Sequence, residues 1–212
     1  MTVFAWTAFA AAAVFALCDW FAVLRSNKRL EFIFKPATLA ALIAAALAID
    51  SSDQKVRAAF VIALCFGLAG DVFLMLPADR FVAGLSAFLL GHVAYVAGLR
   101  IDAASGVSWT VVTLVLIVAG LPLAHRIVRG AVARHASRGP PVAAYTAVIT
   151  LMVSAALVSG DPLAIAGAVL FYVSDTLIGW SRFVRATTWA PLSIIVTYHL
   201  GQALLVASLA SG

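Results

Sequence analysis

Two carboxylates, Asp71 and Asp175, stand inside stretches of sequence that are apolar enough to cross a membrane. The first belongs to the segment Gly-Asp-Val-Phe-Leu-Met-Leu, which ends at Leu76, and the second to the segment Ser-Asp-Thr-Leu-Ile-Gly-Trp, which ends at Trp180. A charged residue within a bilayer costs about 2.5–3.5 kcal/mol on insertion scales, so an intramembrane acid marks a functional site by default. Two such acids in similar segments suggest one shared site.

The two acids also share a depth. In the spans that we expect at residues 58–76 and 162–180, each Asp lies five residues before the end of its helix, and the two helices run in the same direction. At 1.5 Å per residue, both carboxylates lie about 8 Å below the same membrane boundary. Other polar side chains in the apolar stretches can reach the same half of a bundle and are candidates to bind a substrate: Lys35, His92, Tyr95, Tyr145, Arg182, Tyr198, His199 and Gln202.

Neighbouring carboxyl groups can divide into one protonated acid and one carboxylate, which is the arrangement that general acid–base chemistry requires. Asp71 and Asp175 are therefore the predicted catalytic pair. The alternative is a structural role, in which each acid only hydrogen-bonds across helices. Gly67 and Gly70 beside the first acid, and Gly179 after the second, would let a backbone or a ligand approach closely.

A set of two Asp and two His residues contains ligand types that zinc and manganese accept. However, the helical spacings His-x-x-x-His and His-Glu-x-x-His do not occur, so neither a metal nor another cofactor is predicted. Cys18 and Cys65 lie in apolar stretches without metal-ligand spacing, and we expect them to be reduced packing residues. Asp19, near the end of the first apolar stretch, is expected at the membrane interface.

The elements that must position these residues are transmembrane helices. Of the 212 residues, 64% are hydrophobic and 11% are charged, against about 25% charged in soluble domains. A hydrocarbon core of about 30 Å needs about 20 helical residues. The sequence therefore predicts one all-α membrane domain over residues 1–212, an eight-helix bundle whose first span is uncleaved. The expected spans are residues 3–24, 32–49, 58–76, 81–99, 108–124, 141–159, 162–180 and 189–210.

The net charge of +5 does not indicate nucleic-acid binding, because the basic residues follow the loops. Ten lie in loops on one side of the membrane (Arg25, Lys28, Arg29, Arg80, Arg126, Arg129, Arg134, Arg138, Arg182 and Arg185), and only Lys55, Arg57 and Arg100 lie on the other. The positive-inside rule then places both termini outside and the site near the cytoplasmic side. The longest basic loop, from His125 to Pro141, is expected to lie along that surface.

A weak internal repeat accompanies the two acids. Asp71 precedes His92 by 21 residues, and Asp175 precedes His199 by 24 residues, in each case from one helix to the next. A duplication of this kind would be a parallel repeat of four helices plus four, related by an axis along the membrane normal.

Five short motifs of the chain, taken together, resemble the YhhN/lysoplasmalogenase family in order and spacing from about residue 30 to 210. They are Lys35-Pro36, Gly70-Asp71-Val-Phe-Leu-Met-Leu76, Phe88-Leu-Leu-Gly-His92-Val-Ala-Tyr95, Ser174-Asp175-Thr-Leu-Ile with Arg182-Phe183, and Tyr198-His199-Leu-Gly-Gln202. The resemblance implies eight membrane helices, with Asp71 and Asp175 as the catalytic pair. The characterised animal members of that family cleave the vinyl ether bond of lysoplasmalogens, giving a fatty aldehyde and a glycerophospho-base.

Vinyl ether hydrolysis suits these residues, because it begins with proton donation to carbon and forms an oxocarbenium ion that water captures. The division of labour between an acid and an anion is the same as in glycoside hydrolysis. We expect Asp175 to donate the proton and Asp71 to be the carboxylate near Lys35. A lysophospholipid would place its chain among apolar helices, with Lys35, Arg182 or His92 at its phosphate.

Two other functions stay open at this point. A metal-dependent hydrolase of another lipid would use the His and Asp residues as ligands, and a proton-coupled transporter would use Asp–His pairs as a relay. In each case the sequence predicts a multi-pass protein of a bacterial cell membrane, surrounded by lipid, with its site open to the cytoplasmic side. Its oligomeric state does not follow from the sequence.

Overall fold

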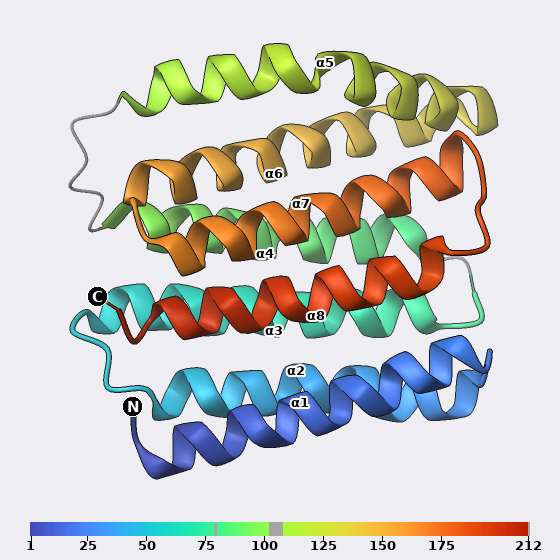
Figure 1. Cartoon of the computed structure of the whole chain (residues 1–212). Helices are drawn as coiled ribbons and strands as arrows, with labels where there is room; N and C mark the ends of the chain where they lie inside the picture. The colour runs from blue at the N-terminus through green and yellow to red at the C-terminus, as the bar shows by residue number, and fades with distance from the viewer. Residues whose placement is uncertain (79, 102–107, 212) are drawn as a thin grey trace.

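The computed structural model describes residues 1–78, 80–101 and 108–211. Within these ranges the protein has eight long α-helices and no strand, and each helix is long and apolar enough to cross a membrane (Figure 1). The helices are α1 (Val3–Leu24), α2 (Lys28–Ala48), α3 (Gln54–Met75), α4 (Phe81–Ile101), α5 (Trp109–Arg134), α6 (Gly139–Ser159), α7 (Pro162–Phe183) and α8 (Ala190–Ser208), with a short 3₁₀ turn at Ala136–Arg138. The eight-helix prediction is confirmed.

Short polar segments begin and end the helices. Between α6 and α7, Gly160 adopts a left-handed backbone with φ +75°, which favours glycine. The next residue, Asp161, caps α7 by accepting a hydrogen bond from the backbone N–H of Ala164, and Pro162 occupies the first helical position. The signal Gly160-Asp161-Pro162 explains why one apolar stretch divides here into two spans.

Helix α2 begins earlier than the sequence predicted. The expected span opened at residue 32, just before Lys35 and Pro36, whereas the helix starts at Lys28, where Asn27 accepts a hydrogen bond from the N–H of Leu30. Lys35 therefore projects from the interior of the helix, two turns from its start, and Pro36 is an internal proline. The prediction was wrong because the polar first turn lowers the hydropathy without breaking the helix.

The basic segment from His125 to Pro141 is not a loop along the surface. Helix α5 continues to Arg134, and α6 already begins at Gly139. Alanine and arginine favour helix formation, so charge alone does not end α5. At Gly130, a Cβ atom would come within 2.3 Å of the carbonyl oxygen of Phe183, so this glycine lets the end of α7 pack closely against α5.

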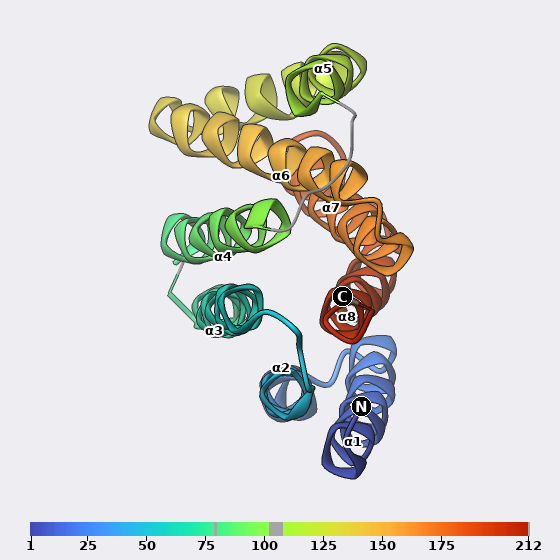
Figure 2. The ribbon, with the colours of Figure 1, turned by 90° about the vertical axis from the view of Figure 1, so that its left-hand side faces the viewer.

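Seven helices form a closed ring when the molecule is viewed along their axes (Figure 2). Contacts pass around it in the order α1, α2, α3, α4, α6, α7, α8 and back to α1, while α5 lies outside against α6 and α7. Both chain ends lie at the same end of the bundle, as an even number of spans requires (Figure 1).

The helix contacts agree in large part with a repeat of four helices plus four. The α1–α2, α2–α3 and α3–α4 contacts have counterparts in α5–α6, α6–α7 and α7–α8, and the α4–α6 contact has its counterpart in α2–α8. The contact of α1 with α8 breaks the symmetry, because it closes the ring on one side where α5 stays outside on the other.

Two glycines bring α7 and α8 unusually close. A Cβ atom on Gly167 would lie 2.9 Å from the carbonyl oxygen of Gly201, and a Cβ on Gly201 would lie 2.9 Å from that of Gly167. Small residues permit such backbone approach in membrane bundles. These two helices carry Asp175 and Tyr198, so the glycine contact sets the distance between the elements of the site.

We expect Gly167→Ala to lower the free energy of unfolding by about 1–3 kcal/mol, because the added methyl group must push α7 away from α8. Thermal unfolding in detergent measures this loss. The matched control is Ala166→Val, which adds volume at a neighbouring exposed position of the same helix. Equal melting temperatures for the two variants would contradict the importance of the glycine contact.

Candidate functional site

Asp71 lies in the interior of the ring, with 1% of its surface exposed. Its Oδ1 atom is 2.9 Å from the Nζ atom of Lys35, and its Oδ2 atom accepts a 2.8 Å hydrogen bond from the hydroxyl of Tyr198. An ammonium group and a hydroxyl group thus both donate to this carboxyl. Donors of this kind stabilise a carboxylate, so the geometry favours Asp71 as the ionised acid.

Asp175 has a different environment, on the α6 and α4 side of the ring. Its Oδ2 atom accepts a 2.5 Å hydrogen bond from the hydroxyl of Tyr145 and lies 3.4 Å from Nε2 of His92. The other ring nitrogen of His92, Nδ1, is 2.5 Å from the carbonyl oxygen of Phe88. A carbonyl oxygen only accepts, so Nδ1 carries a hydrogen, and a neutral His92 would turn the lone pair of Nε2 toward Asp175.

This orientation of His92 determines where a proton is needed. A carboxylate oxygen facing an imidazole lone pair would be repelled, whereas a carboxylic acid facing it is attracted. The Asp175–His92 pair is therefore best satisfied when it holds one more proton than a carboxylate and a neutral imidazole would. The Lys35–Asp71 pair needs no additional proton, because the ammonium of Lys35 already supplies the positive charge.

Aromatic rings form a wall beside the two acids, which interact electrostatically with each other. The ring of Phe171 contacts a partner of each acid: its centroid is 4.7 Å from that of His92 and 5.3 Å from that of Tyr198. Phe88 completes the wall, 5.9 Å from Tyr198. The wall keeps both halves of the site in an apolar environment, where electrostatic interactions are stronger than in water.

The two halves correspond under the four-plus-four repeat. Asp71 on α3 contacts α2 through Lys35 and α8 through Tyr198, while Asp175 on α7 contacts α6 through Tyr145 and α4 through His92. Each acid is thus held by the helix before its own and by the last helix of the other half. Each acid has a tyrosine partner, but the second partner differs: an ammonium group at Asp71 and an imidazole at Asp175.

A narrow pocket opens beside Asp175 and Tyr145, with a volume of about 50 Å³. A water molecule needs about 10–15 Å³ of such space, so this pocket has room for water. The rest of its lining comes from α3 to α7 and is mostly apolar, with hydroxyl groups from Thr146, Tyr172 and Thr176. Phe81 and Phe183 also line it, and the guanidinium of Arg182 lies 4.1 Å from the ring centroid of Phe81. The guanidinium of Arg182 thus lies next to the pocket, against the ring of Phe81.

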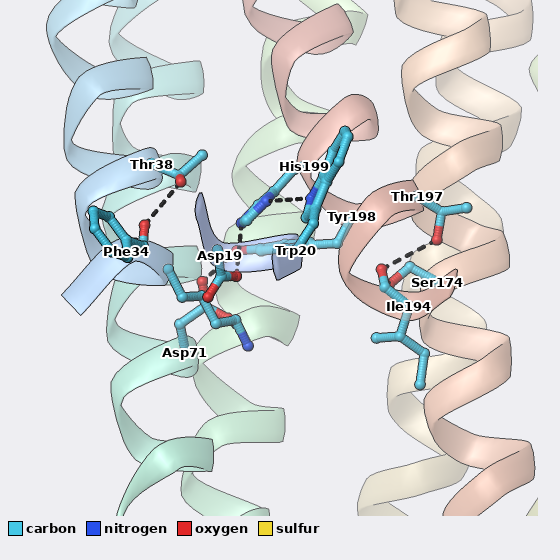
Figure 3. Close-up of polar contacts among 11 residues, drawn as sticks. Asp19, Trp20, Phe34, Thr38, Asp71, Ser174, Ile194, Thr197, Tyr198 and His199 are labelled. Atoms are coloured by element: carbon cyan, nitrogen blue, oxygen red, sulfur yellow. Dashed lines mark hydrogen bonds and ion pairs between the residues drawn. The ribbon is translucent and has the colours of Figure 1, made fainter. Parts of the chain in front are cut away.

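Other predicted residues lie in a second layer. Tyr95 donates a 2.5 Å hydrogen bond to Oε1 of Gln202, and both side chains are buried. His199 turns toward α1, where its Nδ1 atom accepts a 3.1 Å hydrogen bond from the indole N–H of Trp20 (Figure 3). The structure therefore brings Lys35 and Tyr198 to Asp71 but places Tyr95, Gln202 and His199 behind them.

The glycines near the acids make room for side chains rather than for backbones. A Cβ atom on Gly70 would lie 2.6 Å from the ring of Phe88, and one on Gly67 would lie 3.1 Å from Nε2 of Gln202. Gly179 has the same relation to the side chain of Ile127, at 3.0 Å. The glycines beside Asp71 thus fix the position of the aromatic wall and of the Tyr95–Gln202 pair.

The prediction that Asp19 lies at the membrane interface was wrong. Asp19 is buried inside the protein, and none of its surface is exposed. It lies on α1, near His199 and Asp71 (Figure 3). The sequence did carry a signal, because Asp19 stands five residues before the end of α1 at Leu24, the same spacing that marks Asp71 and Asp175 in their expected spans. Trp20 donates a hydrogen bond to the imidazole of His199, but no pattern in the sequence indicated that contact.

Among the residues that the structure describes, no three His, Cys, Asp or Glu side chains converge in a way that could hold a metal ion. Cys18 and Cys65 are both free thiols. The polar groups described around the two acids are carboxyl, ammonium, phenol and imidazole groups.

Comparison with known proteins gives one family. The model of the YhhN family matches residues 30–209. A human protein named "Lysoplasmalogenase TMEM86B" is 31% identical over 148 residues, which are 69% of this chain and 61% of the human protein. The mouse protein of the same name is 30% identical over 146 residues, with the same shares of the two chains.

The chain thus spans less than two thirds of the length of these curated relatives. No solved structure matches the chain. The family match contains both acids, all of their described partners and every helix except α1. The chain therefore belongs to the YhhN family.

Proposed function

We propose that this protein is a membrane hydrolase of the lysoplasmalogenase type, which cleaves the vinyl ether bond of a lysophospholipid to a fatty aldehyde and a glycerophospho-base. The observation that carries the proposal is the difference between the two acids. Each acid accepts a hydrogen bond from a tyrosine, but Asp71 is paired with an ammonium group, whereas Asp175 faces the imidazole of His92. The human and mouse relatives are both named lysoplasmalogenases, which supports the same class of reaction, hydrolysis of a lysoplasmalogen.

The first step is proton transfer from Asp175 to carbon. The π electrons of the vinyl ether form the new C–H bond, which leaves an oxocarbenium ion and the Asp175 carboxylate. Tyr145 donates to that carboxylate and stabilises it. In the second step, a water oxygen bonds to the cationic carbon while one of its protons passes to Asp71, which becomes neutral.

The hemiacetal then collapses and restores both acids. Its hydroxyl proton returns to Asp175, the C–O bond to the glycerol breaks, and the departing oxygen takes the proton from Asp71. Atoms and charges balance over the cycle, with one water consumed. Acid–base assistance of this kind contributes about 10²–10⁴-fold to a rate.

The pocket beside Asp175 accommodates the reacting bond of a single-chain lipid. Its lining is mostly apolar, which suits an alkenyl chain, and the cation of Arg182 near its rim suits a phosphate. With the basic loops placed in the cytoplasm, the site faces the inner leaflet of a bacterial cell membrane. The substrate then enters from the surrounding bilayer.

The direct test is to incubate the purified protein with a lyso-plasmenyl lipid and with the matched lyso-acyl lipid, and to measure fatty aldehyde by mass spectrometry. We expect aldehyde from the first lipid alone. Fatty acid release from the second lipid, without aldehyde from the first, would reject vinyl ether cleavage. The same assay with a chelator separates acid–base chemistry, which persists, from a metal-dependent hydrolase, which stops.

A further inference from the structure

Asp19 on α1 is a buried acid that the proposed reaction does not use. Its residue is 0% exposed, and neither carboxyl oxygen has a hydrogen-bond partner among the described residues. A buried acid without donors is costly unless a charge nearby compensates it. Helix α1 precedes the segment that the family model matches, so the match assigns Asp19 no role.

The imidazole of His199 is oriented toward Asp19. The indole N–H of Trp20 donates to Nδ1, so this nitrogen has no hydrogen and Nε2 carries it. Nε2 lies 4.0 Å from Oδ2 of Asp19. A hydrogen-bond donor thus points to Asp19 from α8, as Figure 3 shows, and a small movement of either side chain would close the distance.

Two cations act electrostatically on Asp19: Lys35, which has the larger effect, and Lys28, whose side chain is 74% exposed. The ammonium of Lys35 interacts electrostatically with Asp71, Asp19 and Glu31. Glu31 is already paired with Lys28, at 2.6 Å, on the same helix. The remaining groups that face this region come from α8, where the hydroxyl of Tyr198 donates to Asp71 and His199 faces Asp19. One cation therefore serves two buried carboxyl groups.

We propose that Lys35 is a shared counter-ion, which pairs with Asp71 when that acid is ionised and with Asp19 when Asp71 holds a proton. The proposal rests on the proposed function for its place in the reaction. After water attack, Asp71 has accepted a proton and no longer neutralises Lys35. Asp19 then supplies the negative charge, and the pairing returns to Asp71 when the hemiacetal collapses. Asp19 is thus a positioning residue that acts through Lys35.

The test is a stability cycle that needs no substrate. In Asp71→Asn, Lys35 still has Asp19, and in Asp19→Asn it still has Asp71, so each single variant should melt close to the wild type. The double variant leaves Lys35 buried without a carboxylate partner. We expect its melting temperature to fall by about 6–20 °C beyond the sum of the two single effects. Adding Lys35→Met to the double variant should restore that loss.

Glu31→Gln is the matched control, because Glu31 also interacts with Lys35 but is paired elsewhere. Combined with Asp71→Asn, it should give additive effects. Additive effects for Asp19→Asn with Asp71→Asn, or no recovery on adding Lys35→Met, would overturn the proposal. These outcomes are independent of aldehyde release, so they are distinguishable from a failure of the proposed function.

Turnover gives a second readout if the wild type releases aldehyde. Asp19→Asn should lower kcat by about tenfold or more while KM stays near the wild-type value, because the variant destabilises only the state in which Asp71 is protonated. A mainly raised KM would instead assign Asp19 to substrate binding and contradict the shared counter-ion. Cys18→Ala, at the preceding position of α1, should leave both constants unchanged.

Discussion

Asp175→Asn should reduce aldehyde release by about 10²–10⁴-fold, with the main loss in kcat, because the amide cannot deliver a proton to carbon. The variant keeps the shape of the side chain, and Tyr145 can still donate to its amide oxygen. Single-turnover rates with a lyso-plasmenyl lipid measure the loss. A variant that retains a tenth of the wild-type rate would exclude Asp175 as the proton donor.

A second variant distinguishes the acid from the base. Asp71→Asn should also lose aldehyde release, but azide, an anion that needs no general base, should add to the cationic carbon in this variant alone and give an azido ether that mass spectrometry detects. Asp175→Asn should form no such adduct, since its block comes before nucleophilic attack. Asp53→Asn is the control: this residue caps the far end of α3, and asparagine caps as well as aspartate. Formation of the azido ether by Asp175→Asn instead would reverse the two roles.

Lys35→Met should have the largest effect on stability. Removing the ammonium leaves Asp71 buried with only the hydroxyl of Tyr198, and breaking a buried ion pair on one side costs about 3–5 kcal/mol. Thermal or chemical unfolding in detergent gives the free energy change. Combining Lys35→Met with Asp71→Asn should recover the part of the loss that comes from Asp71, because only Asp19 then lacks its cation.

Lys28→Met is the matched control on the same helix. Lys28 pairs with Glu31 at 2.6 Å, but 74% of its side chain is exposed, and exposed pairs contribute about 0–1 kcal/mol. A loss at Lys35 no larger than the loss at Lys28 would show that the Lys35–Asp71 pair is screened by water rather than buried in the bundle.

The spans were predictable because each helix must cross a hydrocarbon core alone, which fixes its length and hydropathy in the local sequence. The ends of the helices were less predictable from the sequence. The polar first turn of α2 and the basic last turns of α5 are helical even though they are not apolar, and hydropathy does not distinguish a helix at the interface from a loop there.

The acids were predictable for the same energetic reason, since a carboxyl in a membrane needs a compensating partner. Which partner it has depends on how each helix is rotated about its axis, and one sequence does not contain that information. The contact of Lys35 with Asp71 could be anticipated from depth. The contacts of His92 with Asp175, and of Trp20 with His199, depend on helix pairs far apart along the chain.

Asp19 illustrates a different limit. Its spacing from the helix end equals that of the two predicted acids, yet a residue near the start of a chain, beside a basic turn, is easily interpreted as solvated. Burial arises here because α1 closes the ring against α8. The tertiary contact, rather than the local pattern, makes this acid part of the site.

The closure of the ring by α1 and α8 also constrains the order of assembly. Of the eight described helices, α1 leaves the ribosome before the others and α8 after them, so the seam between α1 and α8 can form only after synthesis has reached α8. Until then, Asp71 lacks Tyr198, and Asp19 lacks His199. The nascent protein therefore holds polar groups in the bilayer that only α8 can satisfy, and synthesis of α8 completes the polar network.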